Sequence, residues 1–291
     1  MKDNLQNQVK INKKKFKLNP VMLVVSIIFG IYAISLVIPL AWGFLKSFSS
    51  RREFFQPGVF PKVWILKNYV DAFVELESGG NNLFVMLFNS VWYALGGALL
   101  QITVASTVAY VCAKYKFELR NMVYYIAVIT MMIPIMGSLP AQFRVSNQLG
   151  IYDTPLSILG SANFLGMPFV ISYAFYKGVS WEYAEAALID GAGHAKIYLE
   201  IMVPMAISPL IALMLTSFIA SWNDETGPLV FLPSYPTLAS GFYVYQKRME
   251  NKINYPVLFA GLFVAAMPII VLYLTFQNTL MDLQLGGGMK G

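Results

Sequence analysis

The sequence predicts an all-α protein that crosses a membrane several times. Of its 291 residues, 57% are hydrophobic and only 12% are charged, whereas an average soluble domain has about 25% charged residues. Long runs lack any charge, and a transmembrane helix needs about 20 mostly apolar residues. Lysines and arginines lie at the ends of these runs and form no basic face. This distribution disfavours a nucleic-acid-binding protein in spite of the net charge of +6.

The chain begins with a basic segment, residues 1–19, and then enters its first apolar run. This arrangement is also that of a secretory signal peptide, whose apolar stretch has roughly 7–15 residues. The run 20–45 is longer than that and ends at Lys46 without a small-x-small cleavage site. We therefore predict that it is retained as the first membrane span.

Six apolar runs are long enough to cross a membrane, and they predict a six-helix transmembrane domain over residues 20–281. The predicted spans are residues 21–45, 83–113, 121–143, 154–176, 205–222 and 255–280. A seventh uncharged run, 226–246, contains Pro228, Pro233 and Pro236, which break a helix that is exposed to lipid. We predict that this run is an external loop, at most dipping into the protein.

The basic residues also predict the orientation, since cytoplasmic segments beside spans carry an excess of lysine and arginine. Just before the first span lie Lys10, Lys13, Lys14, Lys15 and Lys17. They place the N-terminus in the cytoplasm, and six spans bring the C-terminus back to that side. The predicted location is the cell membrane, with the loop after the fourth span facing the cytoplasm.

Charge inside the chain is concentrated in residues 181–204, WEYAEAALIDGAGHAKIYLEIMVP. Ser180 is a suitable N-cap, and Glu185 suits the positive end of a helix. Breakers at 190–193 predict a turn, and a second short helix is expected from about 195 to 203. The first helix carries small side chains, so another backbone can come close to it. Spacing alone favours a solvated connecting loop.

Within this stretch, EAALIDGAGHAKIYLEIMVP resembles the EAA loop of the membrane subunits of binding-protein-dependent ABC importers. The positions that match are Glu185, Ala186, Ala187, Gly191, Ile201 and Pro204. Val203 stands where leucine is usual. In that family the loop fits a cleft on the ATPase subunit and transmits its closure to the spans. The resemblance implies a helix-turn-helix coupling loop over residues 178–204, which docks through the matching residues and Asp190.

A second motif, Ser221-Trp222-Asn223-Asp224 at the end of the fifth span, is similar to one that marks carbohydrate-type members of the family. The segment from Thr130 to Pro134 in the third span is similar to another. The residues that follow the first motif, Glu225-Thr226-Gly227, replace the aromatic or aliphatic residues that are usual there.

The tail 282–291 ends in LGGGMKG and resembles the tail of the second membrane subunit of maltose-type importers, which reaches the ATPase dimer. It lacks the usual small residues before its glycines. The resemblance implies a cytoplasmic tail whose ATPase contacts are Gly286, Gly287, Gly288 and Lys290.

No site for catalysis, metal or nucleotide is expected in this chain. The glycine-rich segment 191–196 lacks the G-x-x-x-x-G-K-[ST] spacing of a phosphate-binding loop, so ATP is expected on a separate ATPase subunit and no cofactor here. His194 is the single histidine and Cys112 the single cysteine, which leaves a metal site unsupported. No Ser-His-Asp or paired-carboxylate arrangement is evident.

Polar residues inside spans are costly in lipid and often face a transport path. The candidates for such a path are Asn89, Gln101, Thr103, Ser217, Trp222, Asn223 and Asn278, with Thr107 and Thr279 as further positions. For each of them, hydrogen bonding between helices is the alternative.

The resemblance implies a permease subunit of an ABC importer for a sugar or oligosaccharide. The partners it implies are a second permease subunit in a heterodimer, two ATPase subunits, and an extracytoplasmic binding protein on the external loops 47–82 and 225–254. A secondary transporter or channel is an alternative, disfavoured because no charged residue lies within the six runs. A membrane-embedded enzyme is disfavoured by the missing catalytic residues. An anionic polyol or uronate remains open as the substrate.

Overall fold

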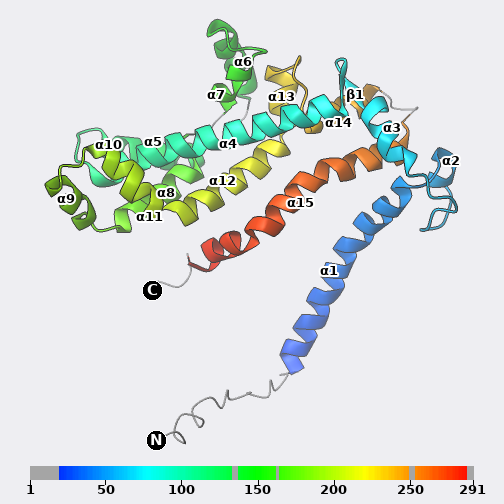
Figure 1. Cartoon of the computed structure of the whole chain (residues 1–291), viewed down its shortest axis with the longest axis horizontal. Helices are drawn as coiled ribbons and strands as arrows, with labels where there is room; N and C mark the ends of the chain where they lie inside the picture. The colour runs from blue at the N-terminus through cyan, green and yellow to red at the C-terminus, as the bar shows by residue number, and fades with distance from the viewer. Residues whose placement is uncertain (1–19, 133–136, 162–163, 249–252, 287–291) are drawn as a thin grey trace, which may run out of the picture.

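Helices make up most of the protein. A computed structural model describes residues 20–132, 137–161, 164–248 and 253–286, so the basic segment 1–19 and residues 287–291 lie outside it. Three long helices fan out from one end of the molecule (Figure 1): α1 (Pro20–Ser47), α4 (Leu83–Lys114) and α15 (Tyr255–Gly286). The all-α prediction is confirmed except for one small hairpin at this end, β1 (Glu77–Ser78) with β2 (Asn81–Asn82).

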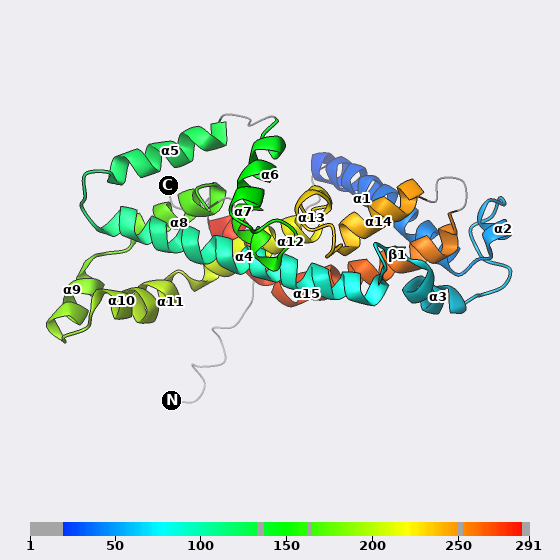
Figure 2. The same cartoon turned by 90° about the horizontal axis from the view of Figure 1, so that it is seen from above.

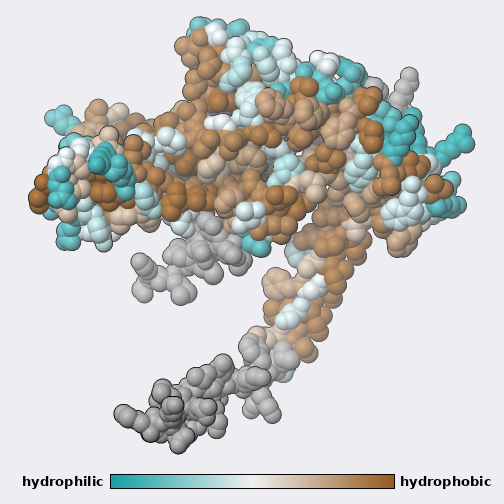
Figure 3. All heavy atoms as spheres, in the orientation of Figure 1, coloured by the Kyte–Doolittle hydropathy of each residue, from teal (hydrophilic) through white to brown (hydrophobic). Residues whose placement is uncertain are grey.

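Three predicted spans are single helices that are long and apolar enough to cross a membrane, namely α1, α4 and the Tyr255–Gln277 part of α15. The fifth predicted span corresponds to α12 (Ile207–Trp222), which meets the preceding helical segment His194–Met205 at an angle of 79°. The surface of α1 is hydrophobic along its length, and hydrophilic residues gather over the opposite ends of the molecule (Figure 3).

The third and fourth predicted spans are not single helices. The third corresponds to α5 (Arg120–Met132) and, beyond residues 133–136, to α6 (Leu139–Gln148). The fourth is divided among η1 (Pro155–Ser157), α7 (Ile158–Ser161) and α8 (Met167–Gly178). These two runs are divided because helix-breaking residues lie within them.

Proline has no N–H to donate, and a proline at the first or second helical position starts a new helix. Pro140, Pro155 and Pro168 occupy such positions in α6, η1 and α8. Gly137 adds a left-handed turn with φ +77° just before α6. Counting uncharged residues therefore overstated the helical length of these two runs. Two views place α6 and α7 on one side of α4 (Figures 1 and 2).

The prediction of an external loop at 226–246 is wrong in its secondary structure. The run forms α13 (Thr226–Phe231) and α14 (Leu238–Arg248). Pro228 lies in the first turn of α13, where a proline is tolerated, and Pro233 and Pro236 lie between the two helices. The prolines thus separate two short helices instead of abolishing them.

Close packing is centred on α4. Its residues Ala94, Ala98, Ala105 and Ala109 are fully buried, and they follow each other at helical spacing along one face. Small residues let neighbouring helix backbones approach closely, which is how helices associate within lipid. The elements that pack most extensively against α4 are α8 and α12.

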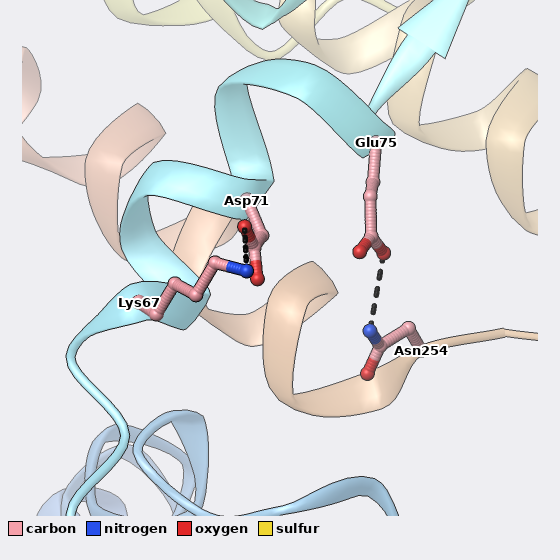
Figure 4. A network of polar contacts seen from close by, with 4 residues as sticks. All are labelled: Lys67, Asp71, Glu75 and Asn254. Carbon is pink, nitrogen blue, oxygen red and sulfur yellow. Dashed lines mark hydrogen bonds and ion pairs between the residues drawn. The ribbon is translucent and has the colours of Figure 1, made fainter.

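Polar contacts hold the segment between α1 and α4 together. The buried Asn68 of α3 (Lys67–Glu75) donates its amide to the carbonyls of Ser47, at 2.7 Å, and Ser49, at 2.9 Å. At the end of the same helix, Glu75 accepts a hydrogen bond from Asn254 Nδ2 at 3.1 Å, which joins α3 to the start of α15 (Figure 4). The ion pair of Lys67 with Asp71, at 3.8 Å within α3, is exposed.

The ammonium of Lys46, at the end of α1, is buried. It donates to the carbonyls of Glu53, at 3.2 Å, and Gln56, at 3.1 Å. Glu53 belongs to the short helix α2 (Arg51–Phe54), so this lysine fixes the chain reversal after the first span.

Within Glu225-Thr226-Gly227, the glycine has a steric reason. The Asp224 carboxylate accepts hydrogen bonds from Tyr93 Oη on α4 at 2.7 Å and from the Gly227 backbone N–H at 2.9 Å. A Cβ atom at position 227 would lie 2.2 Å from Asp224 Oδ2 and 2.6 Å from Tyr93 Oη. Only glycine leaves room for this contact.

We predict that Gly227→Ala lowers the melting temperature in detergent. The new methyl group breaks the hydrogen bond of Tyr93 to the partly buried Asp224 carboxylate, and a hydrogen bond to a charged group contributes about 1.5–3 kcal/mol. Gly30→Ala in α1 is the matched control, since nothing lies within 4 Å of that position and alanine is favoured over glycine in a helix. Equal melting temperatures for the two variants would contradict the prediction.

Candidate functional site

Residues 181–204 form two helical parts separated by a glycine turn. The first is α9 (Glu182–Ile189), and Ser180 Oγ accepts a hydrogen bond from the N–H of Glu182 at 3.3 Å. Gly191 has φ +82°, a left-handed conformation in which glycine is strongly preferred. The turn therefore lies where the breakers predict it, whereas the N-cap of α9 is Trp181 and the expected cap, Ser180, stands one residue before it.

The second part differs from the expected helix. It starts as α10 (His194–Ile197), continues as the π-helix η2 (Tyr198–Met202), and ends as α11 (Val203–Met205). A π-helix carries an extra residue per turn and often lies at a functional site. Met202, within it, is fully buried.

The outer face of α9 is partly apolar. Ala184 is fully buried, while Glu185 and Ala186 are exposed. The exposed apolar side chains are Tyr183 at 54%, Leu188 at 39% and Ile189 at 87%. Sequence analysis did not single out these three residues. The position of Ile189 directly before an Asp-Gly turn was the available signal, since the last residue before such a turn projects from the helix end.

A cavity of about 260 Å³ lies between the two helical parts. We call it the loop notch; it is lined by Ala187, Asp190, Gly191, Ala192, Lys196, Ile197, Glu200 and Ile201. The structure thus brings four of the seven predicted docking residues to one cavity. Glu185, Ala186 and Pro204 are exposed elsewhere on the loop.

The charges of the loop are exposed. Lys196 Nζ lies 3.8 Å from Glu200 Oε2, and such a surface pair contributes only about 0.3–0.5 kcal/mol. Glu185 and Asp190 form no ion pair within the part of the chain that the structure describes. Their carboxylates are therefore available to a cation on another protein.

Hydroxyl groups join the loop to α4 and, through it, to α8. Tyr198 Oη donates to Ser106 Oγ of α4 at 3.1 Å and lies 3.1 Å from Thr107 Oγ1. Ser106 Oγ in turn lies 2.8 Å from Tyr176 Oη of α8. We call these four residues the tyrosine network. It connects the π-helix with α4 and α8.

A second set of contacts fixes the loop to the end of α4. Tyr115 Oη lies 2.9 Å from His194 Nδ1, and its ring packs edge-on against Trp181 at 5.7 Å between centroids. The ammonium of Lys114 donates to the Val179 carbonyl. The loop is therefore attached to the end of α4 by contacts at both of its helical parts.

Among the predicted path residues, Asn89 is engaged in holding a loop. It is buried, its Nδ2 donates to the Pro236 carbonyl at 3.0 Å, and its Oδ1 accepts from Trp92 Nε1 at 3.1 Å. Ser217 is buried as well. Trp222 is buried and stacks on Phe218 with 5.5 Å between ring centroids.

The remaining candidates differ in exposure. On α4, Thr103 is exposed and Gln101 half-buried, and Thr107 belongs to the tyrosine network. Asn223 is exposed at the end of α12, with its Nδ2 donating to the Ile219 carbonyl at 2.8 Å. Asn278 and Thr279 lie in α15, where their side chains are not described.

The predicted tail contacts fall largely outside the structure. Gly286 is the last residue of α15, so the helix continues into the segment expected to be the tail. Gly287, Gly288 and Lys290 lie beyond the described residues, as does Pro134 of the third-span motif. The described residues contain no group of three His, Cys, Asp or Glu side chains that could hold a metal ion.

Comparison with known proteins relates this arrangement to transport systems. The diacetylchitobiose uptake system permease protein NgcG of Streptomyces coelicolor is 26% identical over 254 residues, which cover 85% of this chain and 82% of that protein. The arabinooligosaccharides transport system permease protein AraQ of Halalkalibacterium halodurans is 28% identical over 285 residues, or 95% of this chain and 100% of that one.

A solved structure shares the fold. A chain in the crystal structure of a bacterial ABC transporter involved in the import of the acidic polysaccharide alginate superposes with a TM-score of 0.76, covering 88% of this chain and 95% of that chain at 22% identity. The profile of one family, described as the binding-protein-dependent transport system inner membrane component, matches residues 101–280. Because this match spans more than half of the sequence, the chain belongs to that family of membrane transport components.

Proposed function

We propose that this chain is one permease subunit of an ATP-driven importer that carries a sugar or oligosaccharide delivered by an extracytoplasmic binding protein. The observation that carries the proposal is the loop 178–204. It has an exposed notch, and it is hydrogen-bonded to α4 and, through Ser106, to α8. A loop of this kind can receive force from another protein and pass it to membrane helices. The names of the relatives support the carbohydrate: they include uptake systems for diacetylchitobiose, arabinooligosaccharides and trehalose.

The partners and topology follow from that role. A second permease subunit completes the path, two ATPase subunits dock on the cytoplasmic loops and the tail 282–291, and no nucleotide or other cofactor binds this chain. Six membrane crossings between residues 20 and 281 place both termini in the cytoplasm, with α5 to α8 crossing as broken helices. The binding protein docks on the opposite side.

The mechanism uses two connections. Closure of the ATPase pair displaces α9 and α10. The tyrosine network passes this displacement to α4 and α8, and the 79° bend before α12 passes it to the fifth crossing. Tilting of these helices against the second subunit opens the path alternately to either side. ATP supplies the free energy, and the ATPase subunits favour one state because they contact the loop differently in the two.

An anionic sugar is a second candidate substrate. A relative from Agrobacterium fabrum is named a sulfoquinovosyl glycerol transport system permease protein, and the solved structure belongs to an importer of an acidic polysaccharide. A neutral sugar is favoured for this chain, because its six apolar runs contain no lysine or arginine to pair with an anion.

The docking surface is tested by adding a large side chain to the notch. We expect Gly191→Arg to abolish co-purification of the ATPase from native membranes, because the side chain occupies the notch and the left-handed backbone costs about 1–2 kcal/mol for a residue with a Cβ. Gly193→Arg is the matched control, since this glycine lies two residues on, outside the notch, without a left-handed backbone. Equal ATPase recovery from both variants would count against docking through the notch.

The transmission step is tested by removing one hydroxyl. We expect Tyr198→Phe to keep the ATPase bound and hydrolysing ATP, while uptake of the sugar into proteoliposomes falls by roughly tenfold. The reason is the loss of two hydrogen bonds of about 0.5–1.5 kcal/mol each between the loop and α4. Tyr183→Phe, on the exposed face of α9, is the control. An unchanged ratio of uptake to ATP hydrolysis in Tyr198→Phe would exclude the network from coupling.

A further inference from the structure

A cavity of about 320 Å³ lies at the end of α12 that is distant from the coupling loop. We call it the α14 cavity; it is lined by Trp222, Asn223, Glu225, Leu238, Ala239, Phe242, Tyr243, Gln246, Leu262, Ala265, Ala266 and Ile269. Its volume is near the lower end of the range of roughly 300–1,000 Å³ seen for small-molecule sites. It has room for one ring and not for a chain of them.

Three alanines create the space. Ala239 of α14 and Ala265 and Ala266 of α15 stand where the two helices face each other across the cavity. The lining positions of α14 and of α15 recur at intervals of three and four residues, so each helix presents one continuous face. Most of the wall of this open hollow is therefore formed by helices, with Asn223 and Glu225 from the connection between α12 and α13.

Aromatic side chains form part of the wall. Trp222 and Phe242 are buried, and Trp222 is held by its stacking on Phe218. The ring of Tyr243 is exposed at 37%, with the Lys247 ammonium 5.8 Å from its centroid. Aromatic rings offer flat apolar surfaces, and the C–H groups of a sugar ring pack well against them.

Planar polar groups stand beside these rings. Asn223, Glu225 and Gln246 are all exposed. The side chains of Glu225 and Gln246 form no hydrogen bond or ion pair with any residue that the structure describes, and Asn223 uses only its Nδ2, toward Ile219. An amide both donates and accepts hydrogen bonds, whereas a carboxylate only accepts them, and together these groups suit adjacent hydroxyls on a ring.

We propose that the α14 cavity binds one neutral sugar unit of the transported carbohydrate in this subunit, on the extracytoplasmic side. The proposal rests on the proposed function and adds a place for the substrate. The Glu225 carboxylate at the cavity disfavours an acidic sugar by like-charge repulsion. A larger cavity of about 620 Å³ beside α6 is a weaker candidate for a sugar, because its described lining has a single aromatic residue, Phe231, and no charged side chain.

Two variants test the site in the full assembly in lipid nanodiscs, without binding protein or ATP. The probes are diacetylchitobiose, arabinotriose, lactose and trehalose, each followed by saturation-transfer difference NMR of its ring protons. Ala239→Leu fills the cavity, and Gln246→Ala removes an exposed amide without disturbing the core. We expect at least one probe to give a signal with the wild type, a fivefold or greater loss with Gln246→Ala, and no signal with Ala239→Leu.

Gln142→Ala, an exposed amide on α6, is the matched control and is expected to retain the signal. The absence of a signal with the wild type, or a signal that both cavity variants retain, overturns the α14 cavity as a sugar site. Uptake of the same four sugars into proteoliposomes, measured with binding protein and ATP, distinguishes failure of the sugar site from failure of the proposed function. Uptake without NMR binding at this cavity leaves the proposed function standing, whereas the absence of both rejects the function and the site together.

Discussion

The close packing of α4 against α8 and α12 is the interaction on which the rest of the structure depends. Apolar side chains gain little from associating inside lipid, so helices there are held by close backbone approach and by hydrogen bonds. The fully buried alanines of α4 supply the first. Asn89, Tyr93 and Ser106 on the same helix supply the second. Asn89 and Tyr93 bind Pro236 and Asp224 toward one end of α4, and Ser106 accepts a hydrogen bond from Tyr198 of the loop 178–204 toward the other.

Sequence reasoning located what depends on local chemistry. Long apolar runs identified α1, α4 and α15, and the Gly191 turn followed from breakers among helix-forming residues. It failed where position within an element mattered more than composition. Prolines at helix starts divided the third and fourth runs and allowed α13 and α14 to form, and a residue count treats such prolines like any others.

The candidate sites differ in the same way: a local motif identifies one of them, and long-range contacts form the others. The residues of the loop notch are close together in the sequence, so a local motif could find them. The partners of Tyr198 are 91 and 92 positions away, and the Pro236 carbonyl bound by Asn89 is 147 positions away. Nothing in the local pattern specifies such pairs. The α14 cavity likewise results from alanines on two helices that only the fold brings face to face.

The packing of α1 has a consequence for the order of synthesis. Its helical partner is α15, through contacts such as Trp42 with Phe259 at 6.0 Å and Phe44 with Phe263 at 5.2 Å between ring centroids. Because α15 lies far along the chain from α1, α1 is synthesised well before its helical partner. Until α15 is made, α1 is surrounded by lipid. Its surface is apolar on every side, so the isolated helix is stable there.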